Sequence, residues 1–396
     1  LNIRGNDIAY CPLVLSYAIV YNNSVELFAD IRKFSDDIIN LLAENQVKIY
    51  PYEDIYRKVS EMTSEDKLLL DSSIMNYSLY QSISKETVIV DKQNPEILMK
   101  SVKNETQAEN LRKAHLKDAV AHTKFMYWLK KNIGRVEITE LSASARLEGL
   151  RAEQEHFLGP SFGPISAYGE HGAIVHYSAD EKSNVPLKEG KLFMTDTGGH
   201  YLEGSTDITR TVALGEVGNI EKEHFTLVAR AMLRLANTVF LYGCSGANLD
   251  CIAREVFWKE GLNFNHGTGH GVGYLLNIHE GPINFRWKEG ERPAPALEEN
   301  MVITDEPGIY IEGSHGIRLE NELLVRKTVK NEYGQFMNFE ILTYVPIDLD
   351  AILPEKMSTE EKEMLNHYHK QVYEKVSPYL SEEERIWLKE YTRAVK

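Results

Sequence analysis

Two aspartates, Asp196 and Asp207, are spaced so that their carboxylates could act together. Asp196 lies near the end of an apolar run and precedes two glycines, and Asp207 follows eleven residues later. An aspartate before glycines is often a plain turn residue, but in a β-hairpin this spacing can bring both carboxylates side by side. Two adjacent carboxylates repel each other, and one takes a proton unless a cation lies between them. The pair therefore indicates either a turn or a cation site.

Three histidines, His266, His270 and His279, lie in a glycine-rich segment that reads HGTGHGVG and continues to IHEG. The spacing of the first two resembles that of a helical zinc motif, but the glycines disfavour a helix and the HExxH glutamate is absent. A phosphate-binding loop is disfavoured because neither GK[ST] nor GxGxxG followed by a helix occurs. In a strand, glycines allow the backbone to approach a ligand closely.

Two glutamates, Glu306 and Glu320, follow apolar residues in the segments DEPGIY and GIRLEN. They could be solvated carboxylates beside a Pro-Gly turn, but carboxylates that face inward from strands need a partner. With Asp196 and Asp207 they carry four negative charges, which two divalent cations would balance, and His270 adds a neutral ligand. Carboxylates suit hard ions and one imidazole admits Mn²⁺, Co²⁺ or Zn²⁺. Two such ions can share a bridging hydroxide, a nucleophile for an amide carbonyl.

The elements expected around these residues alternate between helices and strands without a regular βαβ series. Apolar spacing predicts a long helix at 104–134, capped by Asn104, and further helices at 138–149, 219–242 and 251–260. Strands are predicted at 191–197, 207–213, 301–310 and 316–326. The first 95 residues form a small α/β unit with strands at 13–20, 25–29, 46–50, 67–71 and 86–90, and a helix at 35–44. Two capping boxes, at Ser358 and Ser381, predict two helices in the tail.

Composition restricts the class of protein. The 396 residues suggest two or three domains, and the net charge of −15 argues against binding to nucleic acid or an anionic membrane. Three cysteines, with no CxxC spacing, favour a reducing compartment without a disulfide framework. No apolar run is long enough to span a bilayer, and no secretory signal is visible. We therefore expect a cytoplasmic protein, and because the chain begins at Leu1 we expect a fragment or processed form.

Together, the segments DITRT, HGTGHGVG, DEPG and GIRLEN resemble the pita-bread metallopeptidases, and within them the Xaa-Pro aminopeptidases. This resemblance implies an α+β fold in which a pita-bread catalytic domain at 96–346 follows a smaller creatinase N-terminal-like α/β domain at 1–95. A helical extension at 347–396 would complete the chain. The first residues resemble the start of the second domain of the three-domain form, so that the first domain would be missing. The resemblance also implies a homodimer.

The resemblance implies a role for each site residue. Asp196 would bind one metal ion and His270 the other, Asp207 and Glu320 would bridge both, and Glu306 would bind metal and carry a proton from the attacking water to the leaving amine. His176, in the segment AIVHY, would position the substrate and stabilise the oxyanion together with His266 and His279. Thr209, Tyr310 and Arg318 would support the ligands. The cofactor would be two divalent ions, Mn²⁺ first, with Co²⁺ or Zn²⁺ as alternatives. The substrate would be a peptide with proline in second position.

Two alternatives come from different classes. A prolidase, which cleaves only Xaa-Pro dipeptides, has the same ligands, although the long tail favours the aminopeptidase. A non-catalytic pita-bread module that binds peptides would have lost ligands, whereas all five are present here. Creatinase-like chemistry without metal is disfavoured for the same reason, and the flanking residues fit a methionine aminopeptidase less well.

Overall fold

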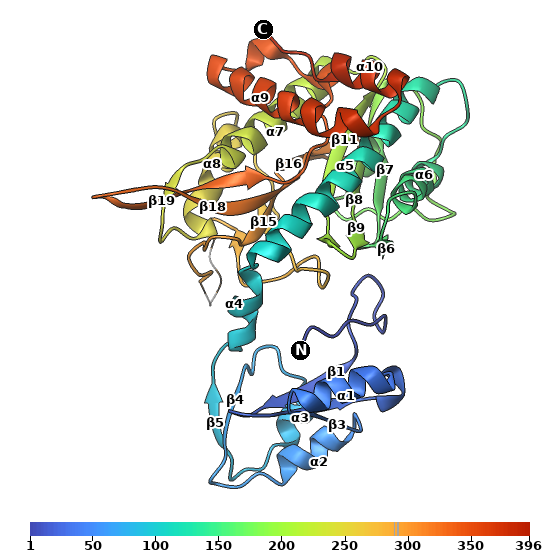
Figure 1. The fold of residues 1–396 in the computed structure, drawn as a ribbon. Helices are drawn as coiled ribbons and strands as arrows, with labels where there is room; N and C mark the ends of the chain where they lie inside the picture. The colour runs from blue at the N-terminus through green and yellow to red at the C-terminus, as the bar shows by residue number, and fades with distance from the viewer. Residues whose placement is uncertain (289, 291–292) are drawn as a thin grey trace. The chain divides into compact units, whose positions relative to one another are not determined.

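The computed structural model describes residues 1–288, 290 and 293–396, which form two compact units (Figure 1). Unit 1 comprises Leu1–Met99 and unit 2 comprises Lys100–Lys396. Helix α4 (Pro95–Ser101) contains the boundary between them. Among the residues that the structure describes, no helix is both long and apolar enough to cross a membrane.

Unit 1 is a small α/β structure. Its three-stranded sheet has the order β1-β2-β3, with β1 antiparallel and β3 parallel to β2, and a separate parallel pair joins β4 to β5. The predicted strands and first helix are confirmed, but two short helices, α2 and α3, escape the sequence pattern because six or seven residues show no clear period. The elements are β1 (Ser16–Val20), β2 (Val25–Ala29), η1 (Ile31–Lys33), α1 (Asp36–Glu44), β3 (Val47–Tyr50), α2 (Asp54–Ser60), β4 (Lys67–Leu70), α3 (Tyr77–Ser82) and β5 (Val88–Asp91).

The helices of unit 2 lie close to their predicted positions, with shifts at some of their ends. Asn104 and Gln107 form a capping box at the start of α5 (Glu105–Asn132), which ends just before Gly134. The helix predicted at 138–149 is α6 (Glu140–Ala152). The helix predicted at 219–242 ends earlier, as α7 (Asn219–Ala236), because the chain then enters the short strand β12 (Phe240–Leu241). Helix α8 (Gly246–Trp258) begins five residues earlier than predicted, at a capping box formed by Ser245.

Antiparallel sheets carry the segments that contain the candidate ligands. One sheet has the order β11-β8-β7, and another has the order β12-β19-β18-β15. Strands β8 and β11 are neighbours as predicted, but they are not joined by a simple hairpin, since the residues between them form β9 and β10. The strands are β6 (Phe157–Pro160), β7 (Ile165–Tyr168), β8 (Lys191–Thr197), β9 (Gly199–Tyr201), β10 (Gly204–Ser205), β11 (Ile208–Leu214), β13 (Gly269–His270), β14 (Asn284–Phe285), β15 (Val302–Asp305), β16 (Gly308–Ile311), β17 (His315–Arg318), β18 (Asn321–Asn331) and β19 (Gly334–Ile341).

The two long strands predicted at 301–310 and 316–326 are each split in the structure. The first divides into β15 and β16 around Glu306 and Pro307, and the second into β17 and β18 around Leu319 and Glu320. Proline lacks the N–H that a continuing ladder needs, so the first break occurs where the sequence removes a donor. Both glutamates therefore lie at bends between strands and not within them.

The tail forms two helices that pack on their own unit. Capping boxes at Ser358 and Ser381 start α9 (Thr359–Val376) and α10 (Glu382–Tyr391), as predicted. Helix α9 contacts α5 and α7, and α10 contacts α5 (Figure 1). The apolar stripe of α9 is buried in the main core, through Leu365, Tyr368, Val372 and Val376. Short 3₁₀ turns complete the unit: η2 (Gly169–Ala173), η3 (Leu349–Ala351), η4 (Pro354–Lys356) and η5 (Ser377–Tyr379).

Candidate metal centre

Strand pairing brings the predicted ligands together from five separate segments. Thr209 on β11 pairs with Asp196 on β8, so Asp207, two residues before Thr209, lies on the same face as Asp196. Asp305 pairs with Asn321, which places the bends that carry Glu306 and Glu320 next to each other. His270 ends β13, and the neighbouring Gly271 bridges to β15.

The candidate ligand atoms form overlapping groups. Asp196, Asp207 and Glu320 offer oxygens that all lie within 4.8 Å of one another, and so do the ligand atoms of His270, Glu306 and Glu320. Glu320 belongs to both groups, and Asp207 also belongs to a third one with His270 and His279. The His270 Nε2 atom lies 3.5 Å from both Asp207 Oδ2 and Glu306 Oε1. This arrangement suits two ions with shared carboxylates.

Burial and charge make this cluster fit cations. Asp196, Asp207 and Glu320 are 8%, 3% and 1% exposed. Burial raises the pKa of Asp207, Glu306 and Glu320 above its ordinary value, and the neighbouring carboxylates add to the rise for all three. In addition, the buried Oδ1 atom of Asp196 has no hydrogen-bond partner in the described part of the chain. Protein groups alone thus leave the cluster short of positive charge, and two divalent cations would correct this.

Hydroxyl groups and main-chain atoms orient individual ligands. The His270 Nδ1 atom lies 3.0 Å from the carbonyl oxygen of Gly271, and a proton on Nδ1 leaves Nε2 as the ligand atom. Thr209 donates its hydroxyl to Glu320 Oε2 at 2.8 Å, as the predicted supporting role requires. Thr304, which sequence reasoning missed, accepts from the His270 N–H and donates to Glu306 Oε1 at 3.2 Å. Its position two residues before Glu306 on a strand was the available signal.

A chain of hydrogen bonds runs from Asp196 to His266. Arg318 donates through Nη2 to Asp196 Oδ2 and through Nη1 to the Tyr310 hydroxyl at 2.8 Å. The Tyr310 hydroxyl lies 2.8 Å from His266 Nε2, and His266 Nδ1 lies 2.7 Å from the carbonyl oxygen of Gly267. Burial lowers the pKa of His266 to about 3 and raises that of Tyr310 to about 12, so both are neutral near pH 7. Both ring nitrogens of His266 thus contact protein atoms, and Tyr310 and Arg318 connect His266 to Asp196.

The other two predicted histidines are exposed. The ring of His279 lies 4.4 Å from that of His270 and 6.4 Å from that of Phe162. Desolvation lowers the pKa of His279 to about 4, with smaller contributions from the charges of His270 and His176. His176 follows η2 and also lowers the pKa of His266, which places it near both histidines. His176 thus lies within electrostatic range of both His266 and His279, and His279 lies against the candidate ligand His270.

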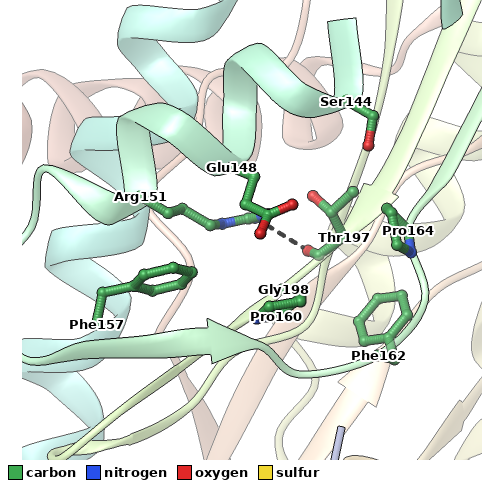
Figure 2. Close-up of a pocket in the computed structure, with 9 residues that line it drawn as sticks. All are labelled: Ser144, Glu148, Arg151, Phe157, Pro160, Phe162, Pro164, Thr197 and Gly198. Carbon is green, nitrogen blue, oxygen red and sulfur yellow. Dashed lines mark hydrogen bonds between the residues drawn. The ribbon is translucent and has the colours of Figure 1, made fainter. Parts of the chain in front are cut away.

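A small pocket lies beside the end of β8 (Figure 2). Aromatic and proline side chains line it together with Arg151, which donates to the Thr197 carbonyl oxygen at 3.2 Å. Because Thr197 follows Asp196 on β8, its side chain points to the opposite face of the strand from the ligand. We therefore assign this pocket to the support of β8 and not to the ligand cluster.

Other buried polar residues fix the main chain around the ligands, and sequence reasoning missed them. Glu322 accepts from the backbone N–H of Asp207 at 2.7 Å, and Arg210 donates to the carbonyl oxygen of Glu320 at 2.5 Å. On α8, Arg254 donates to the carbonyl oxygen of His266 at 2.7 Å. A charged residue inside an otherwise uncharged strand, as Arg210 is, was the only signal of such a role in the sequence.

Comparison with known proteins gives family matches along the whole chain. Residues 109–327 match the model of metallopeptidase family M24. Residues 1–107 match the creatinase/prolidase N-terminal domain, and residues 335–395 match the C-terminal region of peptidase M24. The predicted fold class, a pita-bread catalytic domain preceded by a creatinase N-terminal-like domain, is confirmed.

Proteins and solved structures similar to this chain include Xaa-Pro aminopeptidases and an Xaa-Pro dipeptidase. The probable Xaa-Pro aminopeptidase P of Paracoccidioides brasiliensis is 35% identical over 413 aligned residues, covering 100% of this chain and 67% of that protein. The X-prolyl aminopeptidase of Caenorhabditis elegans, described as a cytosolic enzyme with a di-nuclear active site, has a TM-score of 0.92 at 33% identity and covers 100% of this chain and 66% of that one. The Xaa-Pro dipeptidase of Bacillus anthracis has a TM-score of 0.67 at 25% identity, covering 85% of this chain and 89% of that one.

The chain thus spans about two thirds of the length of the first two relatives. The family match at 109–327 covers more than half of the chain and includes all five candidate ligands. The chain therefore belongs to metallopeptidase family M24.

Proposed function

We propose that this chain is a metal-dependent aminopeptidase that hydrolyses the N-terminal Xaa-Pro bond of peptides. The observation that carries the proposal is the convergence of Asp196, Asp207, His270, Glu306 and Glu320 into overlapping ligand groups. These five residues would hold two divalent ions. When bound, such ions polarise the scissile carbonyl and lower the pKa of water, so that water can attack an amide near neutral pH.

The residues of the chain supply proton transfer. Glu306 lies at the edge of the ligand cluster, and the Thr304 hydroxyl orients its Oε1 atom. It would accept the proton of the attacking water and deliver it to the proline nitrogen as the C–N bond breaks. Arg318 and Tyr310 hold Asp196 and His266 in fixed positions through the hydrogen-bond chain.

Substrate recognition falls to the histidines on the open side of the cluster. His279 and His176 are exposed, and the lowered pKa of His279 keeps it neutral near pH 7. A neutral imidazole can donate one hydrogen bond to the substrate carbonyl, where negative charge develops during attack. His266 would act through Tyr310, which its ring contacts.

The second candidate is a dipeptidase that accepts only Xaa-Pro, since the solved Xaa-Pro dipeptidase shares the fold. The aminopeptidase is favoured because its relatives match 100% of this chain, the C-terminal helices included. An assay with an Xaa-Pro-Xaa tripeptide and the matching Xaa-Pro dipeptide separates the two. We expect cleavage of the tripeptide and little turnover of the dipeptide, and the opposite preference would contradict the proposal.

Further properties follow as proposals. Mn²⁺ is the proposed native ion, with Co²⁺ and Zn²⁺ as alternatives, because one imidazole among carboxylates suits all three. Metal analysis of the purified protein tests this. We also propose the domain division 1–95, 96–346 and 347–396, a homodimer, and a cytoplasmic location, in line with the description of the Caenorhabditis elegans relative as cytosolic. Light scattering that gives a monomeric mass would contradict the homodimer.

A further inference from the structure

Arg210 is a completely buried side chain that connects two segments of the metal centre. It lies on β11, next to Thr209, and is 0% exposed. Its Nη1 atom donates to the carbonyl oxygens of Thr209 at 2.8 Å and Glu320 at 2.5 Å. Thr209 in turn donates its hydroxyl to the Glu320 carboxylate. Arg210 therefore fixes the main chain of a ligand and of the residue that orients that ligand.

The other terminal nitrogen of the same guanidinium contacts the C-terminal helix α9. Tyr368 on α9 is 1% exposed, and its hydroxyl accepts from Arg210 Nη2 at 2.7 Å. The hydroxyl lies 2.6 Å from the carbonyl oxygen of Val345, to which it donates. Arg210 Nη2 also reaches Asn321 Oδ1 at 2.8 Å and the Val345 carbonyl oxygen at 2.9 Å. We call these four residues, Arg210, Asn321, Val345 and Tyr368, the Arg210 cluster.

The planar guanidinium transmits position from one side to the other. Its donors form a rigid fork, so fixing Nη2 also fixes the direction of Nη1. The Tyr368 hydroxyl is a contact that the tail makes with this fork. Its own hydrogen bond to the Val345 carbonyl oxygen holds the hydroxyl in place. Without the hydroxyl, Nη2 keeps only Asn321 Oδ1 and the Val345 carbonyl oxygen as acceptors, so fewer contacts fix the direction of Nη1 toward the Glu320 carbonyl oxygen.

We propose that Tyr368 is a positioning residue for the metal centre, which acts through Arg210 on the bridging carboxylate Glu320. The C-terminal extension thus helps to arrange the ligands and does not only cover the core. This inference rests on the proposed function, because it assigns Glu320 to a metal ion. It concerns residues that do not touch the substrate, and so it predicts weaker metal binding and a lower kcat with little change in KM.

The test compares Tyr368→Phe with the wild type and with Tyr373→Phe on the same helix. Tyr373 is partly buried against the same core, so its variant also removes one hydroxyl from α9. Calorimetric titration of chelator-treated protein with Mn²⁺ is expected to show about tenfold weaker binding for Tyr368→Phe and wild-type binding for Tyr373→Phe. On a tripeptide, kcat of Tyr368→Phe should fall about tenfold while KM stays within about twofold.

A second variant, Arg210→Lys, keeps the charge and loses the fork, and we expect a still larger loss of Mn²⁺ affinity. The inference is overturned if Tyr368→Phe binds Mn²⁺ as tightly as the wild type, or if both tyrosine variants lose the same affinity. If Tyr368→Phe does not fold, Arg210→Lys with wild-type affinity overturns it. A wild type that binds two Mn²⁺ ions but cleaves no Xaa-Pro peptide contradicts the proposed function alone, whereas one that binds no Mn²⁺ contradicts both.

Discussion

Two buried polar clusters in unit 2 lie next to each other and differ in how their charges are satisfied. The ligand cluster, consisting of Asp196, Asp207, His270, Glu306 and Glu320, contains four carboxylates. Burial and mutual repulsion raise the pKa of Asp207, Glu306 and Glu320. In the Arg210 cluster, one guanidinium donates to a hydroxyl, an amide oxygen and several carbonyl oxygens. The first cluster needs a partner from outside the chain, whereas the guanidinium of the second finds its acceptors within the chain.

This difference predicts how the stability contributed by each cluster depends on metal. A buried guanidinium whose acceptors all belong to the chain adds to the free energy of unfolding with or without metal, since its partners fold with it. A cluster of close carboxylates opposes folding until protons or cations neutralise it. We therefore expect variants of the ligand cluster to change activity and metal response, and variants of the Arg210 cluster to change stability even without metal.

The largest effect is expected from Glu306→Ala. This change removes a proposed ligand and the proposed proton carrier, so kcat/KM on an Xaa-Pro-Xaa tripeptide should fall at least about 10⁴-fold. The fold should persist, because the change also removes one of the repelling carboxylates. The matched control is Glu312→Ala, which alters an exposed glutamate in the turn between β16 and β17. Wild-type turnover by Glu306→Ala would show that Glu306 has no role in the chemistry.

Metal removal is the next largest effect. Each Mn²⁺ ion at a free concentration one hundred times its Kd adds about 2.7 kcal/mol to the free energy of unfolding, so two ions add about 5 kcal/mol. Urea unfolding with chelator and with Mn²⁺ measures this difference. The raised pKa of Asp207 and Glu320 also sets the direction of the pH dependence, because the folded chain keeps protons that the unfolded chain releases. The chelated protein should therefore lose stability as the pH rises above about 4, where unfolded carboxyls ionise.

The same experiment has an internal control. Glu320→Gln keeps the shape of the side chain shared by two candidate ligand groups but removes its charge, so the Mn²⁺-dependent increase should be smaller and the chelated protein more stable than the wild type. Equal unfolding curves with chelator and with Mn²⁺ for the wild type would contradict a metal centre in this cluster.

A smaller effect, which does not depend on metal, is expected from Arg210→Met. The variant leaves the carbonyl oxygen of Glu320 without its buried donor, and that of Val345 with the Tyr368 hydroxyl but without Arg210, which should lower the free energy of unfolding by about 3 kcal/mol. The loss should appear in chelator as well as in Mn²⁺. Arg135→Met, at an exposed position, is the control and should change little. A loss seen only with Mn²⁺ present would mean that Arg210 contributes through the ligands alone.

The two clusters also differ in how far the sequence predicts them. The ligands are recognisable because each one interrupts an apolar or glycine-rich segment with a charge, as Asp196 and Glu320 do. Their four carboxylates then indicate, from the residue types alone, that the site binds cations. The Arg210 cluster gives only the charge of Arg210 as a signal, because Asn321 and Tyr368 come from distant segments and three of the acceptors are main-chain carbonyls. Hydrogen bonds to carbonyl oxygens depend on the fold and not on residue type.

Local geometry shows the same limit. An apolar run predicts a continuous strand through residues 301–310, whereas the chain bends at Glu306 and Pro307. The proline made a break foreseeable, but the bend at Glu320 has no proline or glycine to announce it. His266 is a further example, because its type and spacing suggest contact with substrate, while the fold places Tyr310 against its ring. Residue types predict which groups take part, and packing decides the order in which they touch.

The smallest expected effect concerns His369, which follows Tyr368 on α9 and accepts a hydrogen bond from the Ile347 N–H at 3.1 Å. Burial lowers its pKa to about 3, and the charge of Arg210 lowers it further. The unfolded chain therefore binds a proton below about pH 6.5 while the folded chain does not, so this group's stability is complete at pH 7 and is lost as the pH falls. Between pH 7 and pH 5 the loss is about 2 kcal/mol.

The variant His369→Gln tests this effect, because it keeps an acceptor for the Ile347 N–H. In chelator its free energy of unfolding should fall by about 2 kcal/mol less than that of the wild type between pH 7 and pH 5. His367→Gln, at an exposed position, should follow the wild type. Parallel pH profiles for all three proteins would mean that His369 titrates freely in the folded chain.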